Sequence, residues 1–146
     1  CCDIAIGVDS AKFGLTEVKL GLVPAVISPY VIAAIGLRQS RRLFLTGELF
    51  DASTAQRIGL LHQCVRAEEL DDALAGVLAA FAKAGPVAQA QAKRLALRVA
   101  GQDQAQAERI DRENAELIAR LRVSAEGQEG LGAFLDKRAA AWTAQA

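Results

Sequence analysis

The chain has 146 residues, of which 52% are hydrophobic and 23% are charged, a composition typical of a globular domain large enough to bury a core. Its 17 basic and 17 acidic residues cancel, so composition gives no electrostatic basis for binding nucleic acid or an anionic membrane. Three cysteines and one histidine, His62, argue against a disulfide framework, a histidine-rich metal site and a catalytic histidine pair.

No apolar run approaches the roughly 20 residues of a membrane helix, and no signal peptide is recognisable. We therefore expect no membrane association, reduced thiols in Cys1, Cys2 and Cys64, and a cytoplasmic location. The chain lacks an initiator methionine and opens directly on the apolar run "CCDIAIGV". Chain termini are usually frayed and polar, so this opening favours a start in the middle of a domain, with any targeting segment outside the sequence.

The first part of the chain, residues 1–66, alternates short strands with helices. The segment "LFDASTAQRIG", residues 49–59, is expected to open with a short turn, after which Asp51 or Ser53 caps a short helix that ends near Gly59. The other predicted elements are a buried strand over 3–8, a strand over 11–13, a loop with glycines and prolines over 14–29, helices over 28–36 and 37–46, and a strand over 60–65.

From residue 67 onward the apolar residues recur at helical spacing. Ser124 is expected to cap the last helix, with Leu131, Phe134 and Leu135 facing inward. The acidic and basic residues near position 111 are expected to form a solvated helix face or part of a contact between subunits. The predicted helices cover 67–85, 88–100, 103–121 and 125–138.

One acidic residue, Glu17, lies among apolar and small residues in "SAKFGLTEVKLGLVPAVISPY", residues 10–30. Acidic side chains are mostly exposed, so the local pattern alone favours a solvated surface charge. Evidence for a catalytic role of Glu17 therefore has to come from a resemblance that covers more of the chain.

Three blocks of the sequence resemble, in the same order, the enoyl-CoA hydratase/isomerase family, which is the crotonase superfamily. They are "CDIAIGVDSAKFGLTEVKLGLVP", "RRLFLTGELFDASTAQRIGLLHQCV" and "SAEGQEGLGAFLDKR". The resemblance implies an α/β fold in which residues 1–66 form the C-terminal portion of a crotonase-like ββα superhelix. Residues 67–146 would follow as an all-helical C-terminal region that acts in trimerisation or as a lid, so that helix dominates this chain.

The resemblance also implies that part of the active site lies outside the sequence. In this family a glycine-rich loop and a helix precede the "CD" strand. Both backbone donors of the oxyanion hole, and a second glutamate that many members use, would then lie before Cys1. We therefore expect the 146 residues alone to be inactive, because the oxyanion hole is usually a large catalytic term.

Glu17 matches the catalytic carboxylate of the family. The implied reaction is syn addition of water to a 2-enoyl-CoA thioester, in which Glu17 gives a proton to Cα. By family position, Thr16, Leu20, Pro24 and Ala25 are candidate substrate-binding residues. No metal or redox cofactor is implied, because CoA arrives as part of the substrate.

Lys137 lies near the place where related enzymes use a lysine to bind CoA, often that of a neighbouring subunit. A basic residue at a helix end also complements the helix dipole, and the two interpretations are compatible. Members of the family assemble as trimers, often paired into hexamers, so the expected partners are an acyl-CoA and further copies of the chain.

The segment "PAVISPY" replaces the commoner, glycine-rich "PGxGGTxR" of the family. This variant looks most like the branch of 3-methylglutaconyl-CoA and isohexenylglutaconyl-CoA hydratases, which act in leucine and acyclic terpene breakdown. Ala25, Val26 and Ile27 would add bulk where the usual loop leaves the backbone bare.

Two alternatives remain open at this point. An enoyl-CoA double-bond isomerase has the same fold and sometimes uses one carboxylate, so a second glutamate before Cys1 would favour hydration. A non-catalytic or RNA-binding member is the other alternative, although a neutral chain without a basic stripe and interleaved aromatic residues argues against it. His62 is predicted to have no catalytic role.

Overall fold

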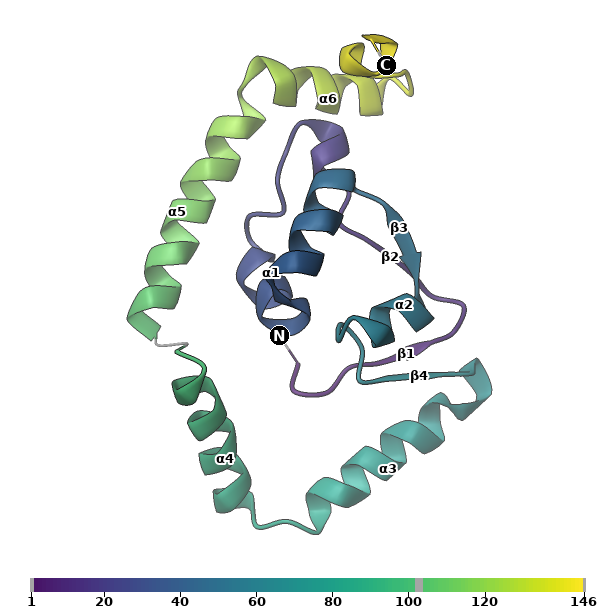
Figure 1. Ribbon diagram of the computed structural model, residues 1–146, viewed down its shortest axis with the longest axis vertical. Helices are drawn as coiled ribbons and strands as arrows, with labels where there is room; N and C mark the ends of the chain where they lie inside the picture. The colour runs from purple at the N-terminus through teal and green to yellow at the C-terminus, as the bar shows by residue number, and fades with distance from the viewer. Residues whose placement is uncertain (1, 102–103, 146) are drawn as a thin grey trace.

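The computed structural model describes residues 2–101 and 104–145, and Figure 1 shows the arrangement of the elements. Cys1 and the expected helix start at Asp103 lie outside the described residues. The elements, in chain order, are β1 (Ile6–Val8), β2 (Lys12–Gly14), the 3-10 helix η1 (Glu17–Leu20), α1 (Ser28–Thr46), β3 (Leu49–Asp51), α2 (Ala52–Arg57), β4 (Gln63–Val65), η2 (Ala67–Glu69), α3 (Leu70–Ala82), α4 (Pro86–Val99), α5 (Gln104–Arg122), α6 (Ala125–Leu135) and η3 (Ala141–Gln145).

The strands form two separate pairs. β1 is parallel to β4, with Gly7 opposite Cys64, and β2 is antiparallel to β3, with Phe13 opposite Phe50. The two phenylalanine rings stack with their centroids 5.8 Å apart, which adds to the stability of the second pair. The strand at β3 was expected to be a turn. That prediction was wrong because β3 depends on pairing with β2, which is distant in sequence.

Two helices were predicted across residues 28–46, and α1 has a break at the expected place. Gly36 has φ 75° and ψ 162°, which is outside the helical region and is accessible to glycine at little cost. Gly47 then ends the helix in the left-handed conformation, and its N–H donates to the Leu43 carbonyl.

The cap of α2 is Asp51. Its Oδ1 accepts a hydrogen bond from the Thr54 N–H at 2.8 Å and another from the Ser53 hydroxyl at 3.0 Å. Both residues proposed for this turn therefore contribute, with Asp51 as the N-cap and Ser53 as its donor.

The core lies between α1, α2 and the strands. Burying a side chain such as that of Leu43 typically stabilises the folded state by about 1.5–3 kcal/mol. This cluster therefore stabilises the part of the fold to which η1 and its flanking loops are attached. Its buried members are Val31, Ile35, Leu43, Phe50, Ala52, Ala55 and Leu61.

Helices α3 and α4 meet at the predicted Gly85-Pro86 boundary. α4 begins at Pro86, two residues before the expected start, because proline fits the first helical position, where no intrahelical N–H bond is needed. α3 contacts β1, and in α4 Lys93 Nζ lies 2.7 Å from Asp3 Oδ2. Neither helix contains a buried residue.

Helix α6 begins at the predicted cap, where the Ser124 hydroxyl oxygen accepts from the Gly127 N–H at 3.1 Å. The expectation that Phe134 and Leu135 face inward was wrong, since they are 67% and 76% exposed. α6 instead buries Gly127, Gly130 and Ala133. These small residues let the helix backbone approach its neighbour closely, and the large side chains are left on the outside.

In Figure 1, α3 to α6 follow one another around the outside of the strands and α1, and α6 returns above the short purple helix η1. α6 contacts η1 directly. Within the described ranges, no single helix combines the length and apolar character needed to cross a membrane. Only Ala67–Ala82 and Pro86–Val99 together satisfy that test, and the two are bent by 103°.

Candidate active site

Glu17 is the first residue of η1, which follows β2 directly. The side chain is half-buried. Its Oε2 atom is inaccessible to solvent and has no hydrogen-bond partner among the described residues. An unpaired buried acceptor typically costs about 1–3 kcal/mol, so the position of Glu17 calls for an explanation.

Glu48 provides a useful comparison within the same part of the fold. Its Oε1 is also buried without a well-aligned hydrogen bond, but Arg42 Nε lies 2.7 Å away. Glu48 therefore has a compensating positive charge. No such ion pair is found for Glu17 in the described part of the chain, so its buried oxygen lacks a compensating charge among those residues.

The candidate substrate-binding residues take different positions around Glu17. Thr16 is exposed and directly precedes it, and Leu20 is half-buried at the other end of η1. Pro24 and Ala25 are buried in the loop that leads to α1. There the Ala25 carbonyl accepts a hydrogen bond from the Ser28 hydroxyl at 2.8 Å, which ties the loop to the first turn of the helix.

Lys137 is exposed and lies just after α6. Its φ of 53° makes it the described non-glycine residue with a left-handed backbone. The Lys137 N–H donates to the Phe134 carbonyl and the Arg138 N–H to the Ala133 carbonyl, which is the Schellman arrangement that usually has glycine at this position. The backbone therefore holds Lys137 in a strained conformation with its side chain outside the core.

The tail after α6 is fixed by Glu129. Its carboxylate accepts from Arg138 Nη1 at 2.7 Å and Nη2 at 2.9 Å, and from the Ala141 N–H at 2.8 Å. The Arg138 guanidinium and, after it, the Ala141 N–H lower the pKa of Glu129 from 4.5 to about 2. This pair of residues was not singled out in the sequence, although both lie in the "EGLGAFLDKR" block.

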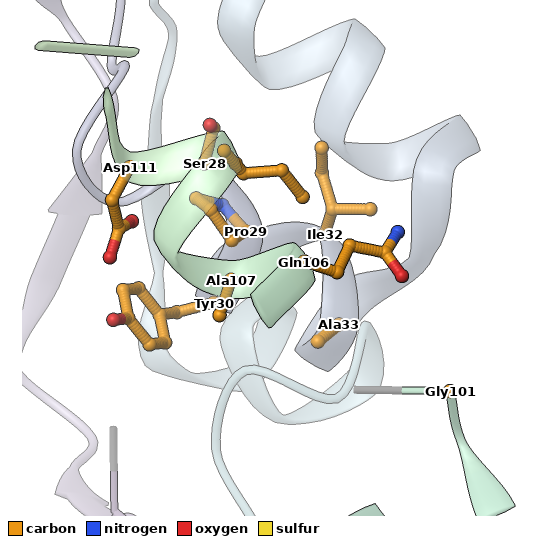
Figure 2. A pocket seen from close by; sticks show the side chains of 10 residues that line it. Ser28, Pro29, Tyr30, Ile32, Ala33, Gly101, Gln106, Ala107 and Asp111 are labelled. Atoms are coloured by element: carbon orange, nitrogen blue, oxygen red, sulfur yellow. The ribbon is translucent and has the colours of Figure 1, made fainter. Parts of the chain in front are cut away.

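A cavity of about 410 Å³ lies between the start of α1 and the start of α5, as Figure 2 shows. Most of its lining is apolar, and Tyr30 and Asp111 lie toward one side of it (Figure 2). Asn114 of α5 also donates to the Ser28 hydroxyl, at 3.4 Å. The lining residues are Ser28, Pro29, Tyr30, Ile32, Ala33, Gly101, Gln106, Ala107, Ile110 and Asp111.

A second cavity, of about 440 Å³, lies between β1 and α3 and includes Ile6, Leu74 and Phe81 in its lining. Glu17 lines neither of these two cavities. Of the candidate residues, Glu17 and Leu20 lie on η1, Thr16 directly precedes it, and Pro24 and Ala25 lie in the loop that follows. Lys137 lines neither of the two cavities, and neither cavity forms a substrate pocket beside Glu17.

His62, for which no catalytic role was predicted, makes a hydrogen bond to the backbone. His62 Nδ1 accepts a hydrogen bond from the Ala5 N–H at 3.1 Å, next to the pairing of β1 with β4. Within residues 2–101 and 104–145, no group of three histidine, cysteine or acidic side chains is placed to hold a metal ion.

Comparisons with known proteins agree with the arrangement of these elements. The sequence model of the enoyl-CoA hydratase/isomerase family matches residues 1–145. A Mycobacterium leprae protein that carries the name enoyl-CoA hydratase echA8 is 34% identical over 143 residues, which is 97% of this chain and 54% of that protein. This chain thus spans about half the length of such relatives.

Solved structures give the same result. An enoyl-CoA hydratase from Mycobacterium avium is 38% identical with a TM-score of 0.83, over 97% of this chain and 54% of that one. An enoyl-CoA hydratase from Shewanella pealeana is 44% identical with a TM-score of 0.64, over 97% of this chain and 52% of that one. The chain therefore belongs to the enoyl-CoA hydratase/isomerase family.

Proposed function

We propose that this chain contributes the proton-transfer part of an enoyl-CoA hydratase active site, with Glu17 as the catalytic acid and base. The observation that carries the proposal is the buried Glu17 Oε2, which has no hydrogen-bond partner in the described part of the chain. The Glu17 carboxyl group therefore has hydrogen-bonding capacity that no described residue satisfies. The names of the relatives support the same class of reaction.

In the proposed reaction, a water oxygen bonds to Cβ of a double bond conjugated to a thioester. The electron pair of the double bond moves toward the thioester oxygen, and Cα takes a proton from the Glu17 carboxyl group, on the face to which the water adds. The water keeps one proton in the new hydroxyl group and gives the other to a base, and solvent returns a proton to the Glu17 carboxylate after each turnover. The elements of water are thus added without change of oxidation state. General acid catalysis of this kind typically contributes about 10²–10⁴-fold.

The direct test is Glu17→Gln in an enzyme of the relatives' length that contains this chain. Turnover of an enoyl-CoA should fall at least ~100-fold, because the amide keeps the shape of the side chain but cannot exchange the proton. Glu48→Gln is the matched control, since its buried oxygen is paired with Arg42 and it should keep near wild-type turnover. Near wild-type turnover of Glu17→Gln would refute the role of Glu17.

We further propose that the 146 residues alone are inactive. The family resemblance puts the oxyanion-hole donors before Cys1, and neither cavity described above contains Glu17. Loss of one such donor typically costs about 10²–10³ in rate. Measurable hydratase turnover by the isolated chain would contradict this proposal.

For the substrate, we propose the methylglutaconyl-CoA branch on the basis of the "PAVISPY" segment. The two buried loop residues Pro24 and Ala25 support a loop whose shape differs from the glycine-rich form. Asp111 lines the first cavity, and its negative charge would repel the free carboxylate of a methylglutaconyl group. We therefore expect that this carboxylate does not bind in the first cavity. A comparison of kcat/KM for 3-methylglutaconyl-CoA and crotonyl-CoA tests the assignment, and a preference for crotonyl-CoA would overturn it.

The proposed partners follow from exposed features of the second part of the chain. Lys137, with its exposed side chain and strained backbone, would bind the phosphate groups of CoA. The exposed apolar residues of α3 and α4, such as Leu74 and Leu95, would be covered in a trimer or hexamer. The thiols of Cys2 and Cys64 are free, which fits a reducing, cytoplasmic setting. No metal or redox cofactor takes part in the proposed reaction.

A further inference from the structure

Helix α6 packs against η1 at the level of the backbone. A Cβ atom added at Gly130 would lie 2.3 Å from the Leu20 carbonyl oxygen and 2.4 Å from the Leu20 carbonyl carbon. Both distances are well under ordinary van der Waals contact, and the obstructing atoms belong to the main chain. Position 130 therefore accepts only glycine unless α6 or η1 moves.

The contact is reciprocal, because η1 also meets α6 with a glycine. Gly21 ends η1 with φ +69°, and a Cβ atom there would lie 2.7 Å from the Glu126 carbonyl oxygen. On another side of η1, a Cβ atom at Gly47 would lie 3.1 Å from the Val18 side chain. η1 thus has close neighbours both in α6 and at the end of α1.

The backbone of η1 couples this contact to Glu17. η1 is one short turn, in which the Gly21 N–H donates to the Val18 carbonyl at 3.2 Å and the Leu22 N–H donates to the Glu17 carbonyl at 3.1 Å. A displacement of Leu20 would shift both of these bonds. Glu17 has no side-chain hydrogen bond to hold its Oε2 independently among the described residues.

We propose that Gly130 is a positioning residue for Glu17. By allowing α6 to lie directly on the Leu20 carbonyl, it fixes η1 and, through it, the Glu17 carboxyl group. The inference rests on the proposed catalytic role of Glu17. It adds that the C-terminal helix α6 sets the geometry of proton transfer without contacting the substrate.

The test compares Gly130→Ala with Gly132→Ala in the same enzyme. Both changes add one methyl group to α6, and both gain the same helix propensity. At Gly132 the nearest atom to the added methyl is Arg138 Nη2, at 3.8 Å. A catalytic group moved by about 1 Å can cost up to about 100-fold in rate. Gly130→Ala should therefore lower kcat about 10- to 100-fold with KM within about threefold, and Gly132→Ala should stay within twofold.

Gly127→Ala separates positioning from loss of stability. Its added methyl would lie 2.0 Å from the Leu121 carbonyl oxygen, so the clash falls on the turn between α5 and α6 and not on η1. All kcat values are taken per folded molecule, with the folded fraction measured by circular dichroism at the assay temperature. Gly130→Ala should lower kcat at least tenfold more than Gly127→Ala.

Equal kcat values for Gly130→Ala and Gly132→Ala, or for Gly130→Ala and Gly127→Ala, would overturn the positioning role. Glu17→Gln, assayed in parallel, tells this failure apart from a failure of the proposed function. If Glu17→Gln is inactive and Gly130→Ala is not impaired, only the positioning role is lost. If Glu17→Gln keeps full turnover, the catalytic role of Glu17 is refuted and the positioning role falls with it.

Discussion

Residues 2–66 and residues 67–145 are stabilised in different ways. Apart from glycine and proline, the described ranges contain nine buried hydrophobic residues, of which eight belong to the first region and one, Ala133, to the second. The first region closes its own core around α1 and α2. In the second, α3 and α4 bury no residue and expose Leu78, Phe81 and Leu95.

The difference shows which part of the second region belongs to the site. Helix α6 is the exception there, since it docks on η1 through Gly130 and carries the buried Ala133. α3 and α4 expose apolar side chains, which is the observation behind the proposed contact with further copies of the chain. Glu17, proposed as the catalytic carboxylate, and α6, proposed as the helix that positions it, thus come from different regions of the chain.

The largest expected effect on stability is that of Leu43→Ala. Leu43 is 3% exposed, and a buried Leu→Ala change typically costs about 2–5 kcal/mol. Leu95→Ala is the matched change in α4, where Leu95 is 51% exposed, and it should stay within about 0.5 kcal/mol. Urea denaturation of the chain measures both. Equal losses would mean that the face of α4 is buried in solution, which would remove the contrast between the regions.

Each region also has one carboxylate with a strongly lowered pKa, and acid should act on the two differently. In the first region, hydrogen bonds from the Thr54 N–H and then from the Thr54 and Ser53 side chains lower the pKa of Asp51 from 3.8 to about 2. The stabilisation from ionised Asp51 is complete above pH 3.8 and is lost as pH falls toward 2. Asp51→Asn keeps a capping acceptor and should remove this part of the pH dependence.

In the second region, Glu129 is the carboxylate with a strongly lowered pKa. Its stabilising contacts with Arg138 are complete above pH 4.5 and are lost as pH falls toward 2. Because Glu129 fixes only the tail after α6, Glu129→Gln should increase proteolysis of residues 139–145 and leave the urea midpoint of the core nearly unchanged. A large fall in that midpoint would show that the tail is part of the cooperative core.

The smallest expected effect is a gain in stability from Lys137→Gly. A left-handed non-glycine residue costs about 1–2 kcal/mol, and the greater freedom of glycine in the unfolded chain offsets roughly half of this, so the free energy of unfolding should rise by about 0.5–1 kcal/mol. The same variant should raise KM for an acyl-CoA if Lys137 binds CoA. A stabilised enzyme with unchanged KM would leave Lys137 without a role in binding.

Much of the local structure could be predicted from the sequence because its signals are local. Gly36 and Gly47 ended helices where expected, and Asp51 and Ser124 cap the helices that they precede. β3 could not be predicted in this way, since Phe50 becomes part of a strand only through its pairing with Phe13.

The candidate site also has features that local sequence signals predict and features that depend on contacts between distant segments. The family resemblance made Glu17 a candidate catalytic residue, but the buried, unpaired state of its Oε2 atom follows only from the folded chain. The contact of α6 with η1 could not be predicted, because helical periodicity points to large apolar residues such as Phe134 and Leu135. The contact is made by Gly130, whose importance lies in the absence of a side chain and in the approach of a distant backbone.

The central claim is that Glu17 transfers the proton at Cα, and solvent-deuterium exchange tests it most directly. Incubated in D₂O with a 3-hydroxyacyl-CoA, the wild-type enzyme and Glu48→Gln should incorporate deuterium at Cα as water is reversibly removed and added. Glu17→Gln should lose at least ~100-fold of this exchange rate. Exchange by Glu17→Gln at the wild-type rate would contradict the account.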